Sequence, residues 1–401
     1  MKKTLFFLLV SLLFSCSLDT SKSSIQQSSR LMLTDSLSFK TRMAVRHQHS
    51  GTYFNEKTKE ELFYFSNIAS TKTIKFFNKG SILVDTVQLN SVLMQSNIHT
   101  IDAIDIISLD TILILSQNSN TLFFIDRQGA VFKELSLDEL FQKNSDDIYS
   151  FRAPVSGTIL LNDSTVVLQA NWDRNKSENT SELSRLEYLK HYVKSYWTKP
   201  SLLVINQIFD ENPNFIFKYS IFPQVIDEID STAFLGEFSR YDFGNNQIIS
   251  WTSYSDKIVL LDSASNVLSV NPIKSSKSEI GDQYFNINKE NVDNFEEVLR
   301  EHERTSSRIG NVIYDSNRNI YYIKVYDKRT LEWFNKNKYR QWSLLVYDEE
   351  FNKLEEISFD KKKYGNGMFK LSKLGLMIEV KKEITDYKNQ TLDFEIYNYE
   401  K

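Results

Sequence analysis

The feature that most constrains the fold is a unit of short strands and turns that recurs along the chain. Its clearest copy is TILILSQNSNTLFFIDRQGAVFKELSL, from Thr111 to Leu137. Three apolar runs of strand length are separated there by a polar loop and by the turn Arg127-Gln128-Gly129. Because the segment Ile101–Ile107 supplies one more strand just before them, the unit predicts a four-stranded antiparallel meander.

The same order of strands, loop and turn occurs elsewhere in the sequence. It is clear in 247–270 and 319–359, and looser in 61–89 and 164–209. A period near 50 residues with two interruptions favours a β-propeller with one meander per blade over a two-sheet sandwich, which requires no such repeat. The third strands are expected to begin near Lys72, Thr121, Ser201, Lys257, Trp342 and Thr391, which are separated by 49, 80, 56, 85 and 49 residues.

Six units predict an all-β fold, a six-bladed β-propeller, in which the sixth unit is one strand short. Its strands are expected at 367–371, 376–380 and 391–397. Leu31–Phe39 has strand character and no partner nearby, so we expect it to supply the missing outer strand and to close the ring. A seventh blade is the alternative, if Leu202–Ser220 and its flanks contain a further unit.

The composition supports a large core without covalent cross-links. Of the 401 residues, 41% are hydrophobic and 13% aromatic, and Cys16 is the only cysteine, so the chain can form no internal disulfide. The net charge of -4 provides no basic field of the kind that nucleic-acid binding requires, so we expect no nucleic-acid partner. We also expect a monomer without a cofactor.

The first residues have the three parts of an export signal. Lys2 and Lys3 precede the apolar run Leu5–Phe14, which has only half of the ~20 residues that a membrane-spanning helix needs. Leu13-Phe14-Ser15-Cys16 resembles a bacterial lipobox, whose cysteine thiol receives a diacylglycerol, although Phe14 departs from the small or β-branched residue usual there. An ordinary signal peptide with an incidental cysteine is the alternative.

These features divide the sequence into three parts. Residues 1–15 are the expected signal peptide, 16–30 the lipidated Cys16 with a Ser- and Gln-rich tether, and 31–401 the propeller domain. The tether has too few apolar residues to order itself. We therefore expect a protein of the cell envelope that is held at the outer membrane by its lipid.

A resemblance to known proteins follows from the lipobox, the Ser-rich tether and the repeated units FFID-RQG, LLD-SASN and LVYD-EEFN. Together they resemble uncharacterised propeller lipoproteins of the Bacteroidetes type, in the family called domain of unknown function 4221. The resemblance covers most of the mature chain, and it implies a six-bladed propeller with an outer-membrane lipid anchor. It implies no catalytic residues, because it rests on architecture and not on a motif with assigned chemistry.

The long segments of the sequence are expected on one face of the propeller. A four-stranded blade places its first-to-second and third-to-fourth turns on one face, and its second-to-third loops and blade links on the other. The expected turns are short, whereas Asn171–Pro200, Asn271–Ser307 and Asp327–Gln341 all belong to the second face, and long loops in compact domains are usually functional. Apolar spacing in 181–197 and 288–305, with a Ser184–Glu187 capping box, predicts helices that either cover the rim or form a lid or docking surface.

The candidate ligand residues are those that this topology places on or near the second face: Arg46, His47, His49, His99, Arg152, Trp172, Arg240, Trp251 and Arg308. The arginines and His99 form either a cationic mouth for an anionic ligand or ordinary surface charges. His47 and His49 either share a metal or form an exposed pair, and without a metal-binding motif we expect no metal. The tryptophans, together with Trp197 and Trp333 in the insertions, either stack on a ligand or pack between blades.

The chemistry-bearing motifs of common enzymes are missing from the sequence. It contains no nucleophile elbow, P-loop or dinucleotide fingerprint. The sequence therefore favours a lipid-anchored binding or scaffold module that recognises a protein, peptide or glycan. A propeller-type hydrolase or lyase with its site at the channel mouth is the alternative, and no catalytic residue is assigned to it.

Overall fold

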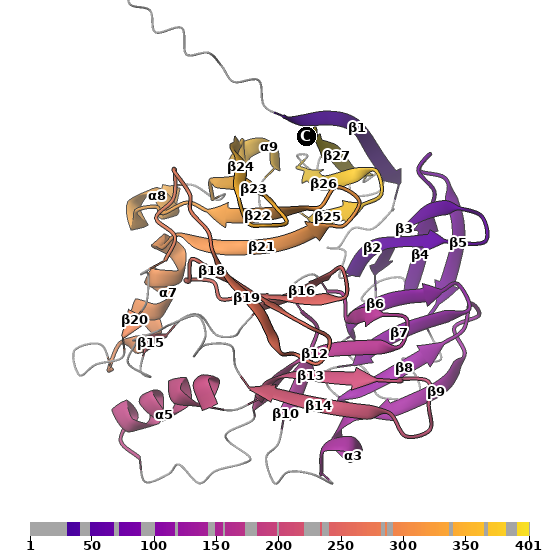
Figure 1. Ribbon diagram of the computed structural model, residues 1–401, viewed down its shortest axis with the longest axis horizontal. Coiled ribbons are helices and arrows are strands. Elements are labelled where there is room, and N and C mark those ends of the chain that lie inside the picture. The colour runs from indigo at the N-terminus through magenta and orange to yellow at the C-terminus, as the bar shows by residue number, and fades with distance from the viewer. Residues whose placement is uncertain are drawn as a thin grey trace, which may run out of the picture.

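The chain forms a ring of six antiparallel sheets, each of which is one blade (Figure 1). The first strands of neighbouring blades lie side by side around the axis. The computed structural model describes residues 30–40, 49–67, 72–89, 101–116, 119–142, 149–154, 157–172, 183–198, 200–219, 233–234, 240–281, 285–286, 292–336, 340–364, 368–381 and 391–400.

Within each blade the strands follow one another from the axis outwards. Blade 1 consists of β2 (His49–Asn55), β3 (Glu60–Asn67), β4 (Thr73–Phe77) and β5 (Leu83–Gln88), and blade 2 of β6 (Ile101–Ser108), β7 (Thr111–Ser116), β8 (Thr121–Ile125) and β9 (Val131–Ser136). Blade 3 consists of β10 (Tyr149–Arg152), β11 (Leu160–Asn162), β12 (Thr165–Trp172), β13 (Pro200–Asn206) and β14 (Asn214–Tyr219), and blade 4 of β16 (Arg240–Gly244), β17 (Gln247–Trp251), β18 (Lys257–Leu261) and β19 (Val267–Pro272). Blade 5 consists of β21 (Arg308–Asp315), β22 (Ile320–Tyr326), β23 (Trp342–Asp348) and β24 (Lys353–Phe359), and blade 6 of β25 (Phe369–Ser372), β26 (Gly375–Val380), β27 (Thr391–Tyr399) and β1 (Leu31–Lys40).

The six-bladed propeller expected from the repeat is confirmed. All six third strands begin within one residue of the predicted positions. The segment Leu202–Ser220, which was the candidate for a seventh blade, instead contributes to β13 and β14 of blade 3.

The third-to-fourth turn has the same geometry in blades 1, 2, 4 and 5. An Asn or Asp ends the third strand, and its side-chain oxygen accepts the backbone N–H of the residue four positions later, at 2.7–3.0 Å. The residue just before that donor has a positive φ, and it is Ser81, Gly129, Ser265 and Phe351 in the four turns. This is a three-residue hairpin loop with a bulge. The repeated FFID-RQG type of motif therefore encodes the hairpin.

Blade 6 is built from both ends of the described chain. β1 pairs antiparallel with β27, from Leu31 opposite Tyr399 to Lys40 opposite Thr391. The N–H of Glu400 donates to the carbonyl of Arg30 at 2.9 Å, so the start of β1 lies beside the C-terminal end (Figure 1). The predicted closing strand is thus confirmed, and it covers the edge that β27 would otherwise expose.

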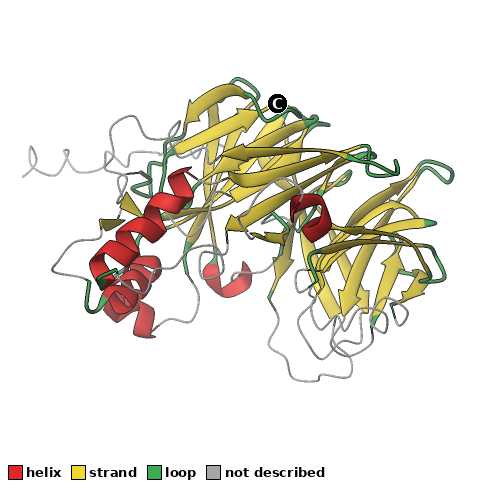
Figure 2. Cartoon of the chain, turned by 90° about the horizontal axis from the view of Figure 1, so that it is seen from below, coloured by secondary structure: helices red, strands yellow, loops and turns green. Residues whose placement is uncertain are grey.

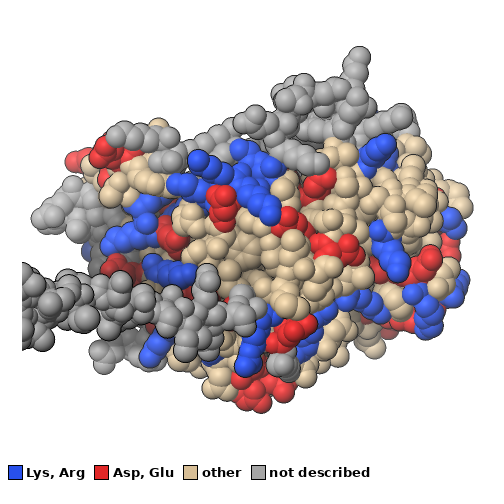
Figure 3. Space-filling view, turned by 90° about the horizontal axis from the view of Figure 1, so that it is seen from above, with Lys and Arg blue, Asp and Glu red and all other residues tan. Residues whose placement is uncertain are grey.

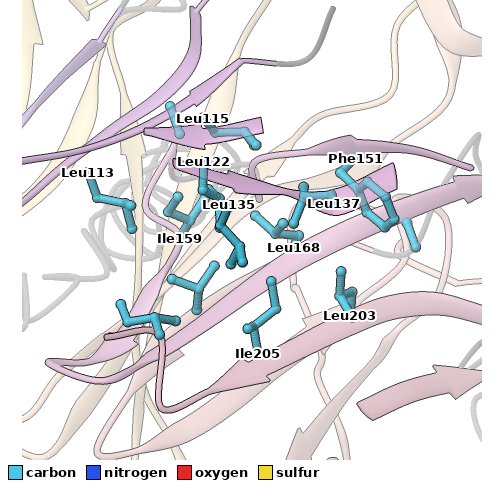
Figure 4. Packing of buried hydrophobic residues seen from close by; sticks show 14 of the residues in the cluster. Leu113, Leu115, Leu122, Leu135, Leu137, Phe151, Ile159, Leu168, Leu203 and Ile205 are labelled. Carbon is cyan, nitrogen blue, oxygen red and sulfur yellow. The ribbon is translucent and has the colours of Figure 1, made fainter. Parts of the chain in front are cut away.

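The core is divided among the six interfaces between blades. A separate cluster of buried apolar side chains lies at each interface. Figure 4 shows the one between blades 2 and 3, where Leu113, Leu115 and Leu122 of blade 2 face Leu168 and Leu203 of blade 3. Stability therefore comes from blade-to-blade packing, which requires the ring to be complete.

All five helices in the described part of the chain lie in blade links or second-to-third loops: α3 (Leu137–Gln142), α5 (Arg185–Thr198), α7 (Phe295–Thr305), α8 (Leu331–Lys336) and α9 (Lys361–Tyr364). We call the face that carries them the helical face, and the face with the short turns the turn face. The sequence did not predict the two-stranded sheet of β15 (Ala233–Phe234) and β20 (Phe285–Asn286), which joins the links on either side of blade 4. None of the helices in these described ranges has the length and apolar character that crossing a bilayer requires.

Candidate functional site

The three long insertions pack on one another at the helical face. α5 begins with the predicted capping box, in which the N–H of Ser184 donates to Glu187 Oε2 at 3.0 Å and the N–H of Glu187 donates to Ser184 Oγ at 3.4 Å. Leu189 of α5 packs on Phe295 of α7 in a small apolar cluster outside the blades, and α7 contacts α8. Figure 2 shows these helices gathered at one side of the molecule. The insertions of blades 3, 4 and 5 therefore form one surface, as expected.

Four arginines meet where α7 leads into blade 5, and we call them the arginine cluster. They are Arg304 of α7, Arg308 at the start of β21, and Arg329 and Arg340 in the loop between β22 and β23. Arg329 Nε donates to the carbonyl of Arg304 at 2.5 Å. Arg308 is close enough to act electrostatically on both Arg329 and Arg340.

Arg340 holds the cluster together. It is buried, and its guanidinium donates to the carbonyls of Asp327 at 2.9 Å, of Glu303 at 3.2 Å and of Ser306. The planar guanidinium spreads five N–H donors over three nitrogen atoms, so it can reach carbonyls that lie further apart than those that one lysine ammonium can bind. Arg340 therefore fixes the end of α7 to the β22–β23 loop and belongs to the support of the site.

Arg308 is the first residue of β21, the inner strand of blade 5. The guanidinium groups of Arg308 and Arg340 lie 5.5 and 5.7 Å from the ring centroid of Tyr326. Gly310 makes room for this ring, because a Cβ at that position would lie 2.5 Å from Tyr326 Cε2. Arg308 also hydrogen-bonds to Tyr254, whose ring is 4.8 Å from that of His302. The aromatic rings thus orient a cation at the start of β21.

The cluster concentrates positive charge. Burial, together with Arg308 and Arg329, lowers the pKa of Arg340 to about 9. Asp327, a carboxylate close to Arg340, accepts a hydrogen bond from Ser278 Oγ at 2.5 Å. Lys and Arg side chains also gather on the neighbouring surface, towards α8 and α9 (Figure 3). Mutually repelling guanidiniums gain free energy from a bound anion, so the geometry suits a carboxylate, sulfate or phosphate group.

Trp333 of α8 adds an aromatic surface beside the cluster. It is partly exposed, as expected, and its ring lies 5.4 Å from the guanidinium of Arg329 and 4.1 Å from Lys361 Nζ. A ring held between two cations is a suitable contact for the apolar face of a sugar or for a peptide side chain.

A second polar group lies on the inner strands around the propeller axis, and we call it the channel group. Lys370 of β25 interacts electrostatically with Asp105 of β6, Asp242 of β16 and His49 of β2. Asp105 Oδ2 accepts from the N–H groups of Ile159 at 2.5 Å and Leu160 at 3.0 Å. Those donors belong to blade 3, whose inner strand is interrupted between β10 and β11, so the carboxylate replaces missing ladder bonds.

Two of the channel groups have shifted ionisation in opposite senses. Burial raises the pKa of Asp105 to about 7, against the effect of its two backbone donors and of Lys370. Burial and Lys370 lower the pKa of His49 to about 4, although its Nε2 hydrogen-bonds to the carbonyl of Ile101 at 3.0 Å. At neutral pH His49 is therefore uncharged.

The two pKa shifts predict opposite effects of pH on the free energy of unfolding, and single variants of His49 and Asp105 separate these effects. The lowered pKa of His49 contributes stability that is lost as pH falls from about 6.5 to 4, whereas the raised pKa of Asp105 contributes stability that is lost as pH rises from about 4 to 7. The wild type is expected to show little net slope between pH 4 and 6.5. Asp105→Asn should become less stable towards acid, and His49→Gln less stable towards neutral pH. Each slope is at most about 1.4 kcal/mol per pH unit.

Urea unfolding at several pH values between 4 and 7 measures these slopes. The Asn variant keeps an oxygen for the N–H groups of Ile159 and Leu160, so it tests ionisation more than the hydrogen bonds. Equal slopes in both variants would show that folding does not shift the pKa values of Asp105 and His49 in opposite directions.

The structure describes only some of the predicted ligand residues, and these lie in different parts of the fold. Arg46, His47 and His99 lie outside the described residues, as does Cys16, and the side chains of Trp172, Arg240 and Trp197 are not described either. His49 faces Lys370 in the channel, Arg152 is exposed and counteracts the raised pKa of Asp102, and Arg308 joins the arginine cluster.

The prediction that Trp251 could contact a ligand is corrected by the structure. It is fully buried in the apolar cluster between blades 4 and 5, so it packs blades together and cannot contact a ligand. Sequence reasoning also missed Arg304, Arg329 and Arg340. Their position in the sequence could have indicated them, since all three lie near the ends of the long segments 271–307 and 327–341, which were expected to be functional. Within the ranges described, no group of three His, Cys, Asp or Glu side chains could hold a metal ion.

The strand order, the closure through β1 and the insertions on one face define the class of this protein: a six-bladed β-propeller with a decorated helical face. It is similar to the crystal structure of a member of the domain of unknown function 4221 family from Bacteroides vulgatus, with 15% identity and a TM-score of 0.65 over 92% of this chain and 97% of that chain. It is also similar to a putative exported protein from Bacteroides fragilis, with 11% identity and a TM-score of 0.51 over 92% of this chain and 96% of that chain. The fold implied by the family resemblance is thus confirmed. No protein-family model and no curated protein matches the sequence.

Proposed function

We propose that this protein is a lipid-anchored propeller of the cell envelope that binds or scaffolds a protein, peptide or glycan, and that it holds an anionic group of that ligand at the arginine cluster. The observation that carries the proposal is the convergence of Arg308, Arg329 and Arg340 beside the partly exposed ring of Trp333. Insertions of blades 4 and 5 bring these residues together at the inner end of blade 5. Guanidinium forks bind carboxylate, sulfate and phosphate groups through paired hydrogen bonds.

The envelope location rests on the N-terminal sequence. The apolar run before Cys16 and the lipobox-like Leu13–Cys16 are the signals of an exported, lipidated protein. One of the similar structures is described as a putative exported protein, which agrees with export. The outer membrane remains the proposed site of the anchor, as the family resemblance implies.

The binding role predicts a selective effect of Arg308→Ala. Because a hydrogen bond to a charged group contributes about 1.5–3 kcal/mol, the variant should bind polyanions about tenfold or more weakly while its melting temperature changes little. Arg308→Lys keeps the positive charge but not the planar guanidinium, so its affinity should lie between those of the wild type and of Arg308→Ala. Titration calorimetry with heparin oligosaccharides and with a polyglutamate peptide measures the affinities and distinguishes a glycan from a peptide ligand.

Arg127→Ala is the matched control. Arg127 pairs with Asp85 at 2.6 Å near the third-to-fourth turn of blade 2, and its side chain is 46% exposed. Loss of such a surface pair costs about 0–1 kcal/mol. If Arg127→Ala weakens binding as much as Arg308→Ala, or if the wild type binds neither probe, the arginine cluster is not a ligand site.

A hydrolase or lyase is the second candidate, and the channel group is the observation that favours it. Asp105, Asp242, His49 and Lys370 interact in the channel and include ionisable groups with shifted pKa values, a pattern common in active sites. However, Asp105 is held by two backbone donors and His49 by Ile101. These bonds are what a structural role requires, so binding is the better supported function.

A further inference from the structure

Among the described residues, the two ends of the blades differ in the exposure of their apolar side chains. On the turn face every blade exposes at least one large apolar side chain near its third-to-fourth turn or, in blade 6, near the start of β1. We call these residues the apolar rim: Met32, Leu33, Ile82, Leu83, Val84, Phe132, Phe209, Val267, Leu268 and Leu354. Among the described residues, the other exposed large apolar side chains are Leu183, Val270 and Leu331.

The exposure is not a general property of outer strands. Four of the outer strands bury an apolar side chain at the end that approaches the helical face: Phe39 of β1, Val87 of β5, Leu135 of β9 and Phe359 of β24. In these four strands the exposed apolar side chains therefore lie at the turn-face end. Scattered apolar residues on a surface need no explanation, whereas a set confined to one face and present in every blade indicates a contact surface.

The N-terminal segment enters the fold at this same face. β1 begins at Leu31, which is opposite Tyr399 at the end of β27, and it runs from the turn face towards the helical face. Fourteen residue steps separate Cys16 from Arg30, so a lipid on Cys16 lies within about 50 Å of the start of β1 even when the tether is fully extended. A short tether raises the effective concentration of the bilayer at the face where it is attached.

We propose that the apolar rim rests on the surface of the bilayer that holds the Cys16 lipid, so that the helical face and the arginine cluster point away from the membrane. This inference rests on the lipid anchor of the proposed function. Six blades contribute to the rim around one end of the ring, which gives a broad contact suited to a membrane surface. Partly inserted apolar and aromatic side chains are the usual means by which such proteins lie on a bilayer.

Site-specific fluorescence in vesicles tests the orientation. The full lipidated chain is reconstituted in phosphatidylcholine vesicles that contain a lipid-attached quencher, with one added thiol carrying an environment-sensitive dye. The native thiol of Cys16 is blocked by its lipid. Leu83→Cys and Phe132→Cys report on the rim, and Leu331→Cys in α8, where the native side chain is 37% exposed, is the matched control on the helical face.

The rim labels are expected to shift to the blue and to be quenched at least about twofold more than the label at position 331. Adding Leu33→Glu to the Leu83→Cys chain should reduce that difference. Equal quenching at the two faces in vesicle-bound protein overturns the orientation while leaving the anchor intact. A labelled chain that stays in the supernatant overturns the anchor and the orientation together. Blue shifts at the rim that appear without vesicles and grow with protein concentration overturn the proposal in favour of a second copy of the chain.

Discussion

Phe39→Ala is expected to lower the free energy of unfolding by about 3–5 kcal/mol, the cost of truncating a buried phenylalanine. Phe39 is 0% exposed, and its ring centroid lies 5.0–5.6 Å from those of Phe63, Phe65 and Phe77 in blade 1. A fourth ring, Phe394, lies at 6.1 Å. The side chain therefore joins the closing strand of blade 6 to blade 1, and a cavity there loosens the last interface of the ring. Urea unfolding measures the change.

Leu33→Ala is the control on the same strand. Leu33 is 54% exposed, so its truncation should change stability by no more than about 0.5 kcal/mol. Two deletions extend the test, since removal of 31–40 should cause aggregation or loss of the cooperative transition, and removal of 17–29 should cost little. Similar behaviour of the two deletions would show that β1 does not hold the ring closed.

Cys16→Ser is expected to abolish lipid labelling and to move the protein from the membrane fraction to the soluble fraction. The thiol is the only group in the chain that a lipobox-directed transfer can use, because the sequence has no other cysteine. Each buried methylene of an attached chain contributes about 0.8 kcal/mol to membrane binding, so removing the lipid removes most of that attraction. Labelling with radioactive palmitate, followed by fractionation of cells, measures both effects.

The folded domain should be unaffected, since Cys16 precedes the first strand of the propeller, β1, by 15 positions in the sequence. An unchanged unfolding curve of the Ser variant, together with loss of membrane retention, supports the anchor. Full membrane retention of the Ser variant would mean that another feature holds the protein and that Cys16 is incidental.

The architecture could be predicted because each blade repeats a local pattern. The Asp-containing turns set the hairpins at Asp126, Asp262 and Asp348, and the apolar runs before them are the third strands. The capping box at Ser184 and Glu187 likewise marked the start of a helix through local hydrogen bonds alone. The closing role of Leu31–Phe39 could be predicted by counting strands, because the sixth unit was one strand short and Leu31–Phe39 had no partner nearby in the sequence.

The site could be predicted only in part, because it depends on contacts between distant segments. Arg308 was a candidate from its place at an inner strand, but Arg340 acts through carbonyls of α7 and its loop. Trp251 is the last residue of the second strand β17, and whether such a ring faces solvent or a neighbouring blade depends on packing that no local pattern encodes. Of the channel group only His49 was a candidate, and its partners Lys370 and Asp105 were missed because they are 265 positions apart.

The pairing of β1 with β27 also sets the order in which the molecule can assemble. Leu31 and Tyr399 are separated by 368 positions, so their ladder cannot form until nearly all of the chain has been made. Bringing such distant segments together carries a loop-closure entropy cost and slows folding. A chain that cannot complete its ring early stays unfolded longer, and this would suit the export that we propose, in which the chain crosses a narrow channel before it folds. The pairing of β1 with β27 would then be the last folding step, after the chain has crossed the membrane.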